Sequence, residues 1–100
     1  MRESEVEKHL VQRVKELGGE VRKVKWIGRD GAPDRLVMMP APTLHSNPEW
    51  SAVTRTTWVE LKAPGAKAKP HQLREHERMR KMGQRVLVID SIEGVEAFLA

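Results

Sequence analysis

A stripe of four apolar side chains predicts a helix near the start of the chain. These side chains recur at intervals of three or four residues, and they are Val6, Leu10, Val14 and Leu17. That spacing places them on one face of a helix, which we predict over residues 3–17. Gly18 and Gly19 follow directly and end it, because glycine is frequent just past the last turn of a helix.

Four short segments have the composition of strands. They cover residues 20–27, 35–39, 56–62 and 85–89, and they are rich in β-branched, aromatic or alternating apolar residues. Turn-forming residues separate the first two segments. Residues 40–55 contain three prolines and show no consistent period, so we predict a long loop there.

Two further helices complete the predicted order of elements. Pro70 suits the first turn of a helix that runs to Met82. Asp90 or Ser91 can cap a last, short helix that ends near Leu99. Three consecutive strands followed by a helical crossover predict an α/β fold with a mixed four-stranded sheet, flanked by helices.

Length and composition narrow the class of protein. We expect 100 residues to form a single domain, spanning 1–100. The absence of cysteine excludes disulfides, a thiolate nucleophile and cysteine-ligated metals. Charged residues stand at the N-terminus, where a signal peptide would be apolar, and the apolar runs are short. We therefore expect a cytoplasmic protein with no membrane partner.

Basic residues are concentrated in one part of the chain. The net charge is only +4, but residues 62–85 hold eight of the eighteen Lys and Arg residues and only two acidic residues. A basic segment of this kind is typical of a protein with a polyanionic partner. On charge alone, a solvated surface explains it equally well.

Two carboxylates and a lysine are the strongest chemical signal. Asp34 precedes the second strand and Glu60 comes near the end of the third, so antiparallel pairing would bring them together at one edge of the sheet. Lys62 shares a face with Glu60, because alternate residues of a strand point the same way. Two such carboxylates repel each other unless a cation lies between them, and oxygen ligands suit Mg²⁺ or Mn²⁺. An ordinary Glu60–Lys62 salt bridge is the alternative.

The combined motif resembles a known nuclease family. Residues 31–35 read Gly-Ala-Pro-Asp-Arg, residues 58–62 read Trp-Val-Glu-Leu-Lys, and Gln72 follows a basic loop. This pattern resembles the virus-type replication-repair nuclease (VRR-NUC) domain of the PD-(D/E)XK nuclease superfamily, over nearly the whole chain. The resemblance implies the restriction-endonuclease-like α-β-β-β-α-β core and a metal-dependent DNA endonuclease.

The resemblance also implies a role for each residue of the motif. Asp34 and Glu60 would ligate Mg²⁺ or Mn²⁺, together with the main-chain carbonyl of Leu61. Lys62 would be the catalytic lysine. Gln72 would match the glutamine that the family places at the start of this helix, although it can instead bond the preceding loop as a first-turn amide.

The first helix of the superfamily usually adds an acidic residue to the metal site. Glu3 continues the apolar stripe towards the sheet edge, so we favour it as a ligand, directly or through water. Glu7 is the second choice because it lies off the stripe.

Basic side chains near the motif are expected to contact DNA phosphates. They are Arg29, Arg35, Lys67, Lys69, His71, Arg74 and Arg78. His71 and His76 could both reach phosphate, but a surface position without function is the favoured interpretation of the histidines. We interpret Trp26 and Trp58 as packing residues rather than platforms for bases, and Met79 and Met82 as a pair in helix packing.

The family resemblance implies a nuclease that acts on branched or duplex DNA. Because free-standing members of the family resemble junction resolvases, branched DNA such as a Holliday junction is the specific prediction. One site in a small chain cuts two strands most simply as a symmetric homodimer, to which residues 40–55 could contribute a dimer or substrate contact. A phage origin and a role in DNA repair fit the resemblance. The alternatives are a non-catalytic nucleic-acid-binding module that keeps the nuclease fold, and an interaction domain with a basic face.

Overall fold

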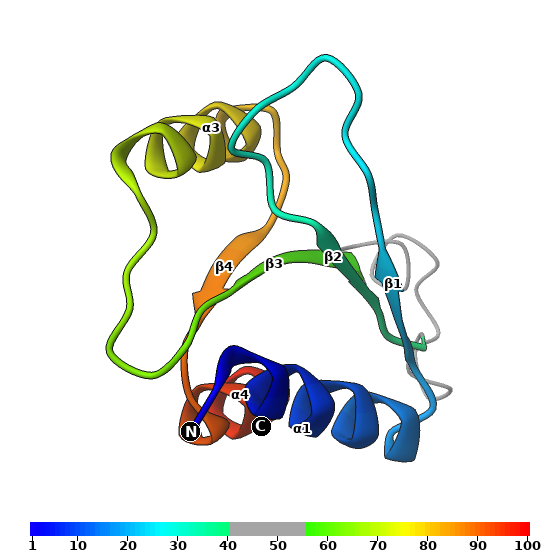
Figure 1. Cartoon of the computed structure of the whole chain (residues 1–100). Helices are drawn as coiled ribbons and strands as arrows, with labels where there is room; N and C mark the ends of the chain where they lie inside the picture. The colour runs from blue at the N-terminus through cyan, green and yellow to red at the C-terminus, as the bar shows by residue number, and fades with distance from the viewer. Residues whose placement is uncertain (41–55) are drawn as a thin grey trace.

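The computed structural model describes residues 1–40 and 56–100, so all of the predicted loop 40–55 except Pro40 lies outside the described residues. The described part forms three helices and one four-stranded sheet (Figure 1). In chain order the elements are α1 (Glu3–Glu16), β1 (Glu20–Lys23), β2 (Arg35–Met38), β3 (Thr56–Leu61), α3 (Pro70–Lys81), β4 (Val86–Ile89) and α4 (Ile92–Leu99). The predicted α/β fold is confirmed.

The sheet has the predicted mixed topology. Its strand order is β1-β2-β3-β4, with antiparallel pairing between the first three strands and parallel pairing between β3 and β4. Helices α1 and α4 lie on one side of the sheet and α3 lies on the other side (Figure 1). The helix α3 provides the crossover that parallel neighbours require.

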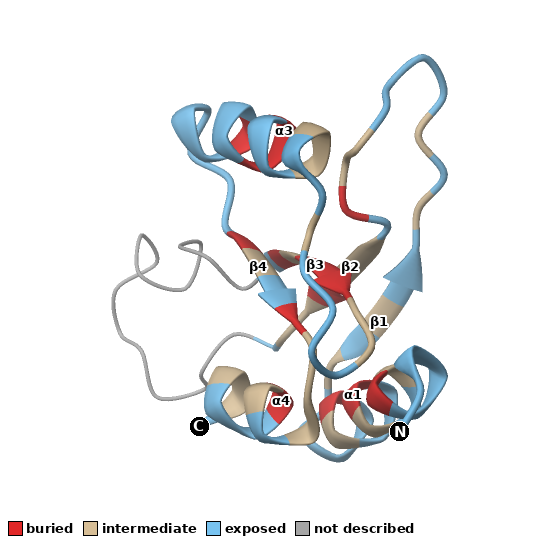
Figure 2. Ribbon diagram, turned by 60° about the vertical axis from the view of Figure 1, so that its left-hand side comes forward, coloured by how far each residue is buried: buried red, intermediate tan, exposed pale blue. Residues whose placement is uncertain are grey.

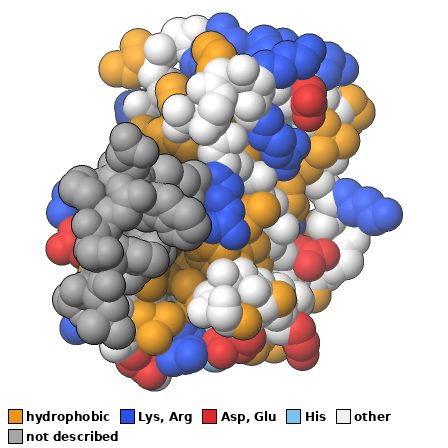
Figure 3. Space-filling model, turned by 180° about the vertical axis from the view of Figure 1, so that it is seen from behind, with side chains coloured by type: hydrophobic (Ala, Val, Ile, Leu, Met, Phe, Trp, Pro, Cys, Tyr) orange, Lys and Arg blue, Asp and Glu red, His pale blue; other side chains and the backbone are white. Residues whose placement is uncertain are grey.

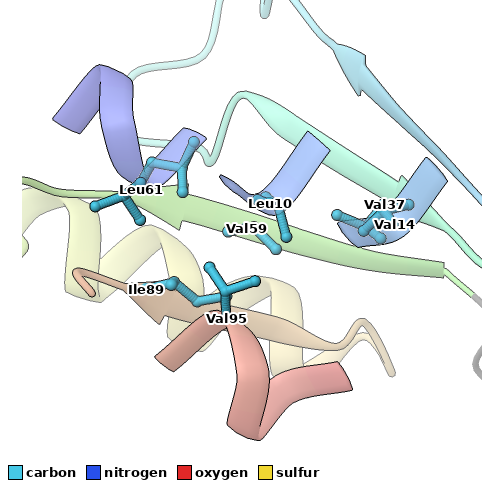
Figure 4. Close-up of a cluster of buried hydrophobic side chains, with 8 residues drawn as sticks. Leu10, Val14, Val37, Val59, Leu61, Ile89 and Val95 are labelled. Carbon is cyan, nitrogen blue, oxygen red and sulfur yellow. The ribbon is translucent and has the colours of Figure 1, made fainter. Parts of the chain in front are cut away.

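The hydrophobic core lies between the sheet and the pair α1 and α4. The central strands contribute Val37, Val59 and Leu61, and α4 contributes Val95 (Figure 4). Three of the four predicted stripe residues of α1 are fully buried, as Figure 2 shows in red along this helix. Leu17 is the exception, with 41% of its surface exposed, because α1 ends at Glu16.

The first strand is shorter than predicted. It ends at Lys23 rather than near residue 27, whereas the other predicted boundaries agree to within about one residue. Beyond the end of this strand the loop turns at Gly28 and Gly31, whose φ angles of 77° and 82° an extended strand does not contain. The two ends of the loop between β1 and β2 stay joined, because Val24 N–H donates a 3.0 Å hydrogen bond to Asp34 O.

Helix α3 buries a different face from the one that its apolar residues predict. Its buried residues are Glu75, His76 and Met79, whereas Met82, at its C-terminal end, is 71% exposed. The predicted packing pair of methionines is therefore wrong for Met82. Within residues 1–40 and 56–100, no helix has the length and apolar character needed to cross a membrane.

Candidate active site

The β2–β3 register brings the two predicted carboxylates together. Arg35 pairs with Val59, so the next step of this antiparallel register places Asp34 opposite Glu60. Both residues line one pocket of about 450 Å³, on the side of the sheet that faces α3. The Asp34 side chain is 59% exposed, whereas Glu60 is 8% exposed. One carboxylate therefore faces solvent and the other lies at the base of the pocket.

Gly31 fits the turn before Asp34 closely against α3. A Cβ atom added at Gly31 would lie 3.0 Å from both the Cδ2 and the carbonyl oxygen of His71. Two residues further on, the buried Pro33 accepts a 2.8 Å hydrogen bond from the Trp26 indole to its carbonyl oxygen. The turn is thus held on both sides, and Asp34 emerges from it in a defined position.

His76 lies beneath the site and contacts Glu60. Its Nε2 atom is 3.3 Å from Glu60 Oε1, and the residue has no exposed surface. Its Nδ1 atom has no hydrogen-bond partner among the described residues. The expected surface position is therefore wrong for His76. The spacing of Gln72, His76 and Met79, four and then three residues apart, was the signal that could have placed it on the buried face.

Burial makes Glu60 difficult to ionise. It raises the pKa of Glu60 to about 7, against the lowering effect of Lys62, while the carboxylates of Asp34 and Glu3 raise this pKa further. The pKa of His76 is lowered, chiefly by burial and then by the charges of Arg80 and Lys62. Burial therefore favours the neutral form of the histidine, and the Glu60 carboxylate lacks full compensation from nearby cations.

This donor set fits a hard divalent cation. Mg²⁺ is commonly bound by one or two carboxylates and keeps several waters, and Asp34 and Glu60 supply two such groups. Within residues 1–40 and 56–100, no group of three or more His, Cys, Asp or Glu side chains is arranged to hold a metal. The remaining ligands would be water or main-chain oxygen, such as the Leu61 carbonyl that the family resemblance implies.

The two acidic candidates on α1 have different neighbours. Glu7 forms an ion pair with Arg35, whose Nη1 atom is also 2.9 Å from Asp34 Oδ1. Glu3 is exposed and lies close enough to Glu60 for its charge to raise the pKa of that carboxyl. The charge of Glu3 therefore affects the ionisation of Glu60, whereas Glu7 is linked to Asp34 by the ion pairs that Arg35 makes with both. The preference for Glu3 stays a prediction.

Lys62 and Gln72 border the carboxylate pair. Lys62 is half-buried, and its charge acts on Glu60, while the Leu61 side chain between them packs into the core on the other side of the sheet. Gln72 lines the pocket, and its Oε1 atom accepts a 2.8 Å hydrogen bond from Lys69 N–H. That bond is the alternative, first-turn role considered for this glutamine.

A buried acid engages two of the residues expected to contact DNA. Arg29 Nη2 and Arg78 Nη2 each lie 2.7 Å from Glu75 Oε1, and Glu75 is only 3% exposed. Hydrogen bonds from Arg29 are the main cause of the lowering of the Glu75 pKa to about 2. This cluster anchors the loop before β2 to α3. Sequence reasoning missed it because ion pairing over 46 residues leaves no local pattern.

The other predicted DNA-binding residues lie around the pocket and on exposed surface. His71 lines the pocket, whereas Lys67, Lys69 and Arg74 are exposed. Figure 3 shows Lys and Arg side chains gathered over the end of the molecule that carries α3. The phosphate contacts of all these residues stay predictions.

Comparison with known proteins places the chain in a family. No family model matches it. It is 43% identical over 91 residues to "Putative nuclease p44" of Acyrthosiphon pisum secondary endosymbiont phage 1, which covers 91% of this chain and 85% of that protein. It is 40% identical to a solved structure described as "VRR_NUC domain", with a TM-score of 0.76 over 97% of this chain and 92% of that one. These similarities confirm the resemblance, and the chain belongs to the VRR-NUC family of nucleases.

Proposed function

We propose that this protein is a metal-dependent DNA endonuclease whose active site is built on Asp34, Glu60 and Lys62. The observation that carries the proposal is the antiparallel register, which sets Asp34 opposite Glu60 with Lys62 two residues further along. Two adjacent carboxylates with a lysine beside them can serve phosphate hydrolysis, because they provide ligands for a cation and a positive group for the developing charge. The family, and not the geometry alone, indicates nuclease chemistry.

Asp34 and Glu60 would hold Mg²⁺ or Mn²⁺, with the Leu61 carbonyl and, through water, Glu3. Such a cation, when bound, polarises the phosphate and lowers the pKa of a coordinated water. Glu60 must lose its proton to act as a ligand. This loss takes place near neutral pH, because burial raises the pKa of Glu60 to about 7. The Lys62 ammonium would stabilise negative charge on the attacked phosphate, and Gln72 would contact the substrate from the pocket wall.

Exposed basic residues would hold the DNA backbone. Lys67, Lys69 and Arg74 are exposed, and His71 stands on the wall of the pocket. Contacts of this kind recognise phosphate and carry no base sequence, so selection by DNA shape follows. Arg29 and Arg78 would approach the phosphates with one side of each guanidinium already held by Glu75. Arg35 would do so from between Glu7 and Asp34, which pair with both sides of its guanidinium.

We further propose a homodimer that acts on branched DNA. Each chain carries the one proposed site, and two strands at a junction are cut most simply by two such sites in a symmetric arrangement. The intracellular location and the role in DNA repair stay predictions.

Cleavage of labelled DNA by matched variants tests this function. Four-way junction, flap, duplex and single-stranded DNA are each incubated with the protein and Mg²⁺, Mn²⁺ or chelator. We expect the parent to cut only with metal, and Asp34→Ala and Lys62→Ala to bind DNA but lose at least about 100-fold in rate. Glu93→Ala and Lys15→Ala remove exposed charges of the same sign elsewhere and should cut normally.

The possible outcomes separate the alternatives. Undiminished cleavage by both site variants overturns the site. If the parent binds DNA but cuts none of the substrates, the non-catalytic binding module is the better description. Light scattering on the protein with and without junction DNA measures the oligomeric state, and a monomer that resolves junctions overturns the homodimer.

A further inference from the structure

A second pocket lies beside the one that contains Asp34 and Glu60. It has a volume of about 450 Å³ and shares Trp26 and Arg29 with its neighbour. Its other apolar walls are Trp58, Met79 and Met82. We call it the indole pocket, after its two tryptophan rings.

The two indole rings are held in place from within the protein. Their centroids are 5.1 Å apart and their planes are tilted by 48°. Trp26 donates its N–H to Pro33 O over 2.8 Å, and Trp58 donates its N–H to Gln84 Oε1 over 3.1 Å. Both rings are only half-buried, so the sequence-based interpretation of Trp26 and Trp58 as packing residues accounts for only part of each ring. The polar atom of each ring is thus satisfied, and ring surface remains for a ligand, in an orientation that needs no rearrangement on binding.

The indole pocket lies next to the carboxylates along β3, because it includes Trp58. Trp58 and Glu60 point to the same face of β3, because they are two residues apart, which corresponds to about 7 Å along a strand. A ligand that places a phosphate at Glu60 can therefore place an adjoining flat ring against Trp58. Met82, which lines the pocket, leaves 71% of its surface exposed, so an apolar side chain stands at an open position.

The charge around the pocket favours an anionic strand. The side chains of Arg29 and Arg78 are 46% and 52% exposed, and both pair with the buried Glu75 carboxylate. Two guanidinium groups around one carboxylate leave a net positive charge beside the apolar walls. Flat apolar surface next to positive charge is the combination that binds single-stranded nucleic acid.

We propose that the indole pocket receives one unstacked nucleobase of the DNA strand whose phosphate lies at Asp34 and Glu60. This inference rests on the proposed DNA endonuclease function and specifies its substrate. A base can enter only after it leaves its stack and its partner, which is easiest where the strand is unpaired. The nuclease would therefore cut next to unpaired nucleotides at a junction or flap rather than within continuous duplex.

Substrates that lack a single base test the pocket. An abasic nucleotide is moved through the positions around the cut, and kcat/KM is measured for the parent, for Met82→Glu and for Leu73→Glu. Leu73 is a matched control, because it lies on the same helix, is 50% exposed and does not line the pocket. For the parent we expect one position at which loss of the base lowers kcat/KM about tenfold.

The two variants should respond differently to base removal. Met82→Glu should cut intact DNA about tenfold more slowly and show no further loss at the sensitive position. Leu73→Glu should keep the parent's dependence on that base. Equal sensitivity at every position, or an unchanged dependence in Met82→Glu, overturns the proposal. A change of oligomeric state in Met82→Glu with unchanged base dependence also overturns the proposal. That result would assign the pocket to contact with a second copy of the chain.

A photocrosslink separates failure of the pocket from failure of the nuclease function. Junction and single-stranded DNA with 5-iodouracil at successive positions are bound to the protein in the presence of chelator and irradiated. Mass spectrometry then identifies the residue that is crosslinked to the DNA. We expect a crosslink to Trp26 or Trp58. Crosslinks only to other residues overturn the pocket, even if the protein cuts DNA. Crosslinks to these rings support it, even if no metal produces cleavage.

Discussion

His76 Nε2 lies 3.3 Å from Glu60 Oε1, with the histidine entirely inside the protein. The contact links α3 to the carboxylate at the base of the proposed metal site. Carboxylates that bind metals are generally oriented by hydrogen bonds from neighbouring groups. The neutral Nε2–H tautomer of His76 would provide such a bond to Glu60.

Replacement of His76 should weaken metal binding more than folding. We expect His76→Leu to lower Mn²⁺ affinity about 10- to 100-fold, because Glu60 loses the group that orients it. The melting temperature should change little, since leucine fills much of the same space and removes an Nδ1 atom that lacks a partner among the described residues. Calorimetric titration with Mn²⁺ measures the affinity. His76→Gln, which retains a donor, should recover part of it, and equal affinity in His76→Leu contradicts the role.

Glu60 should make the stability of the metal-free protein depend on pH. Because its pKa is raised from 4.5 to about 7, the folded state binds a proton more tightly than the unfolded state in this range. This group therefore lowers the free energy of unfolding as the pH rises from about 4.5 to about 7. Thermal unfolding in chelator measures the fall, and Glu60→Gln should make it smaller. An undiminished fall in the variant would show that another group is responsible.

Glu75 should act in the opposite direction and at lower pH. Hydrogen bonds from Arg29 lower the pKa of this carboxyl to about 2, against the opposing effect of burial. The contribution of Glu75 to stability is therefore complete above about pH 4.5 and is lost as the pH falls towards 2. We expect Glu75→Gln to lower the free energy of unfolding by about 1–3 kcal/mol at neutral pH.

Urea unfolding at several pH values measures this effect of Glu75→Gln. Its control is Glu77→Gln on the same helix, where a 61% exposed side chain pairs with Arg80 over 3.7 Å. That variant should cost less than about 1 kcal/mol. Equal losses in the two variants would contradict a special role for the buried acid.

Substitution of Gly31 should disturb both folding and the position of Asp34. Gly31→Ala combines a positive φ angle with a Cβ atom only 3.0 Å from His71, and we expect it to cost about 2–4 kcal/mol. Gly28→Ala has a similar φ angle but open space around its Cβ, so it should cost about 1–2 kcal/mol. Urea unfolding compares the two. Similar losses would show that contact with α3 contributes nothing.

The local pattern was sufficient for the elements and for their order. The stripe on α1 and the β-rich segments depend on side-chain periods that each segment carries by itself, and α1 buries Val6, Leu10 and Val14 as predicted. The proximity of Asp34 to Glu60 also followed from the sequence, because antiparallel neighbours bring the start of one strand to the end of the next.

Helix α3 marks the limit of that reasoning. By itself the sequence determined that residues 70–81 are helical, but it indicated Met82 as packed and His76 as exposed, and the structure shows the opposite. Apolar periodicity fails here because the buried face carries Glu75 and His76, which are stabilised by partners 46 and 16 residues away. Only the tertiary structure decided which charges compensate each other, since burial of a polar group depends on a partner that the chain brings in from elsewhere.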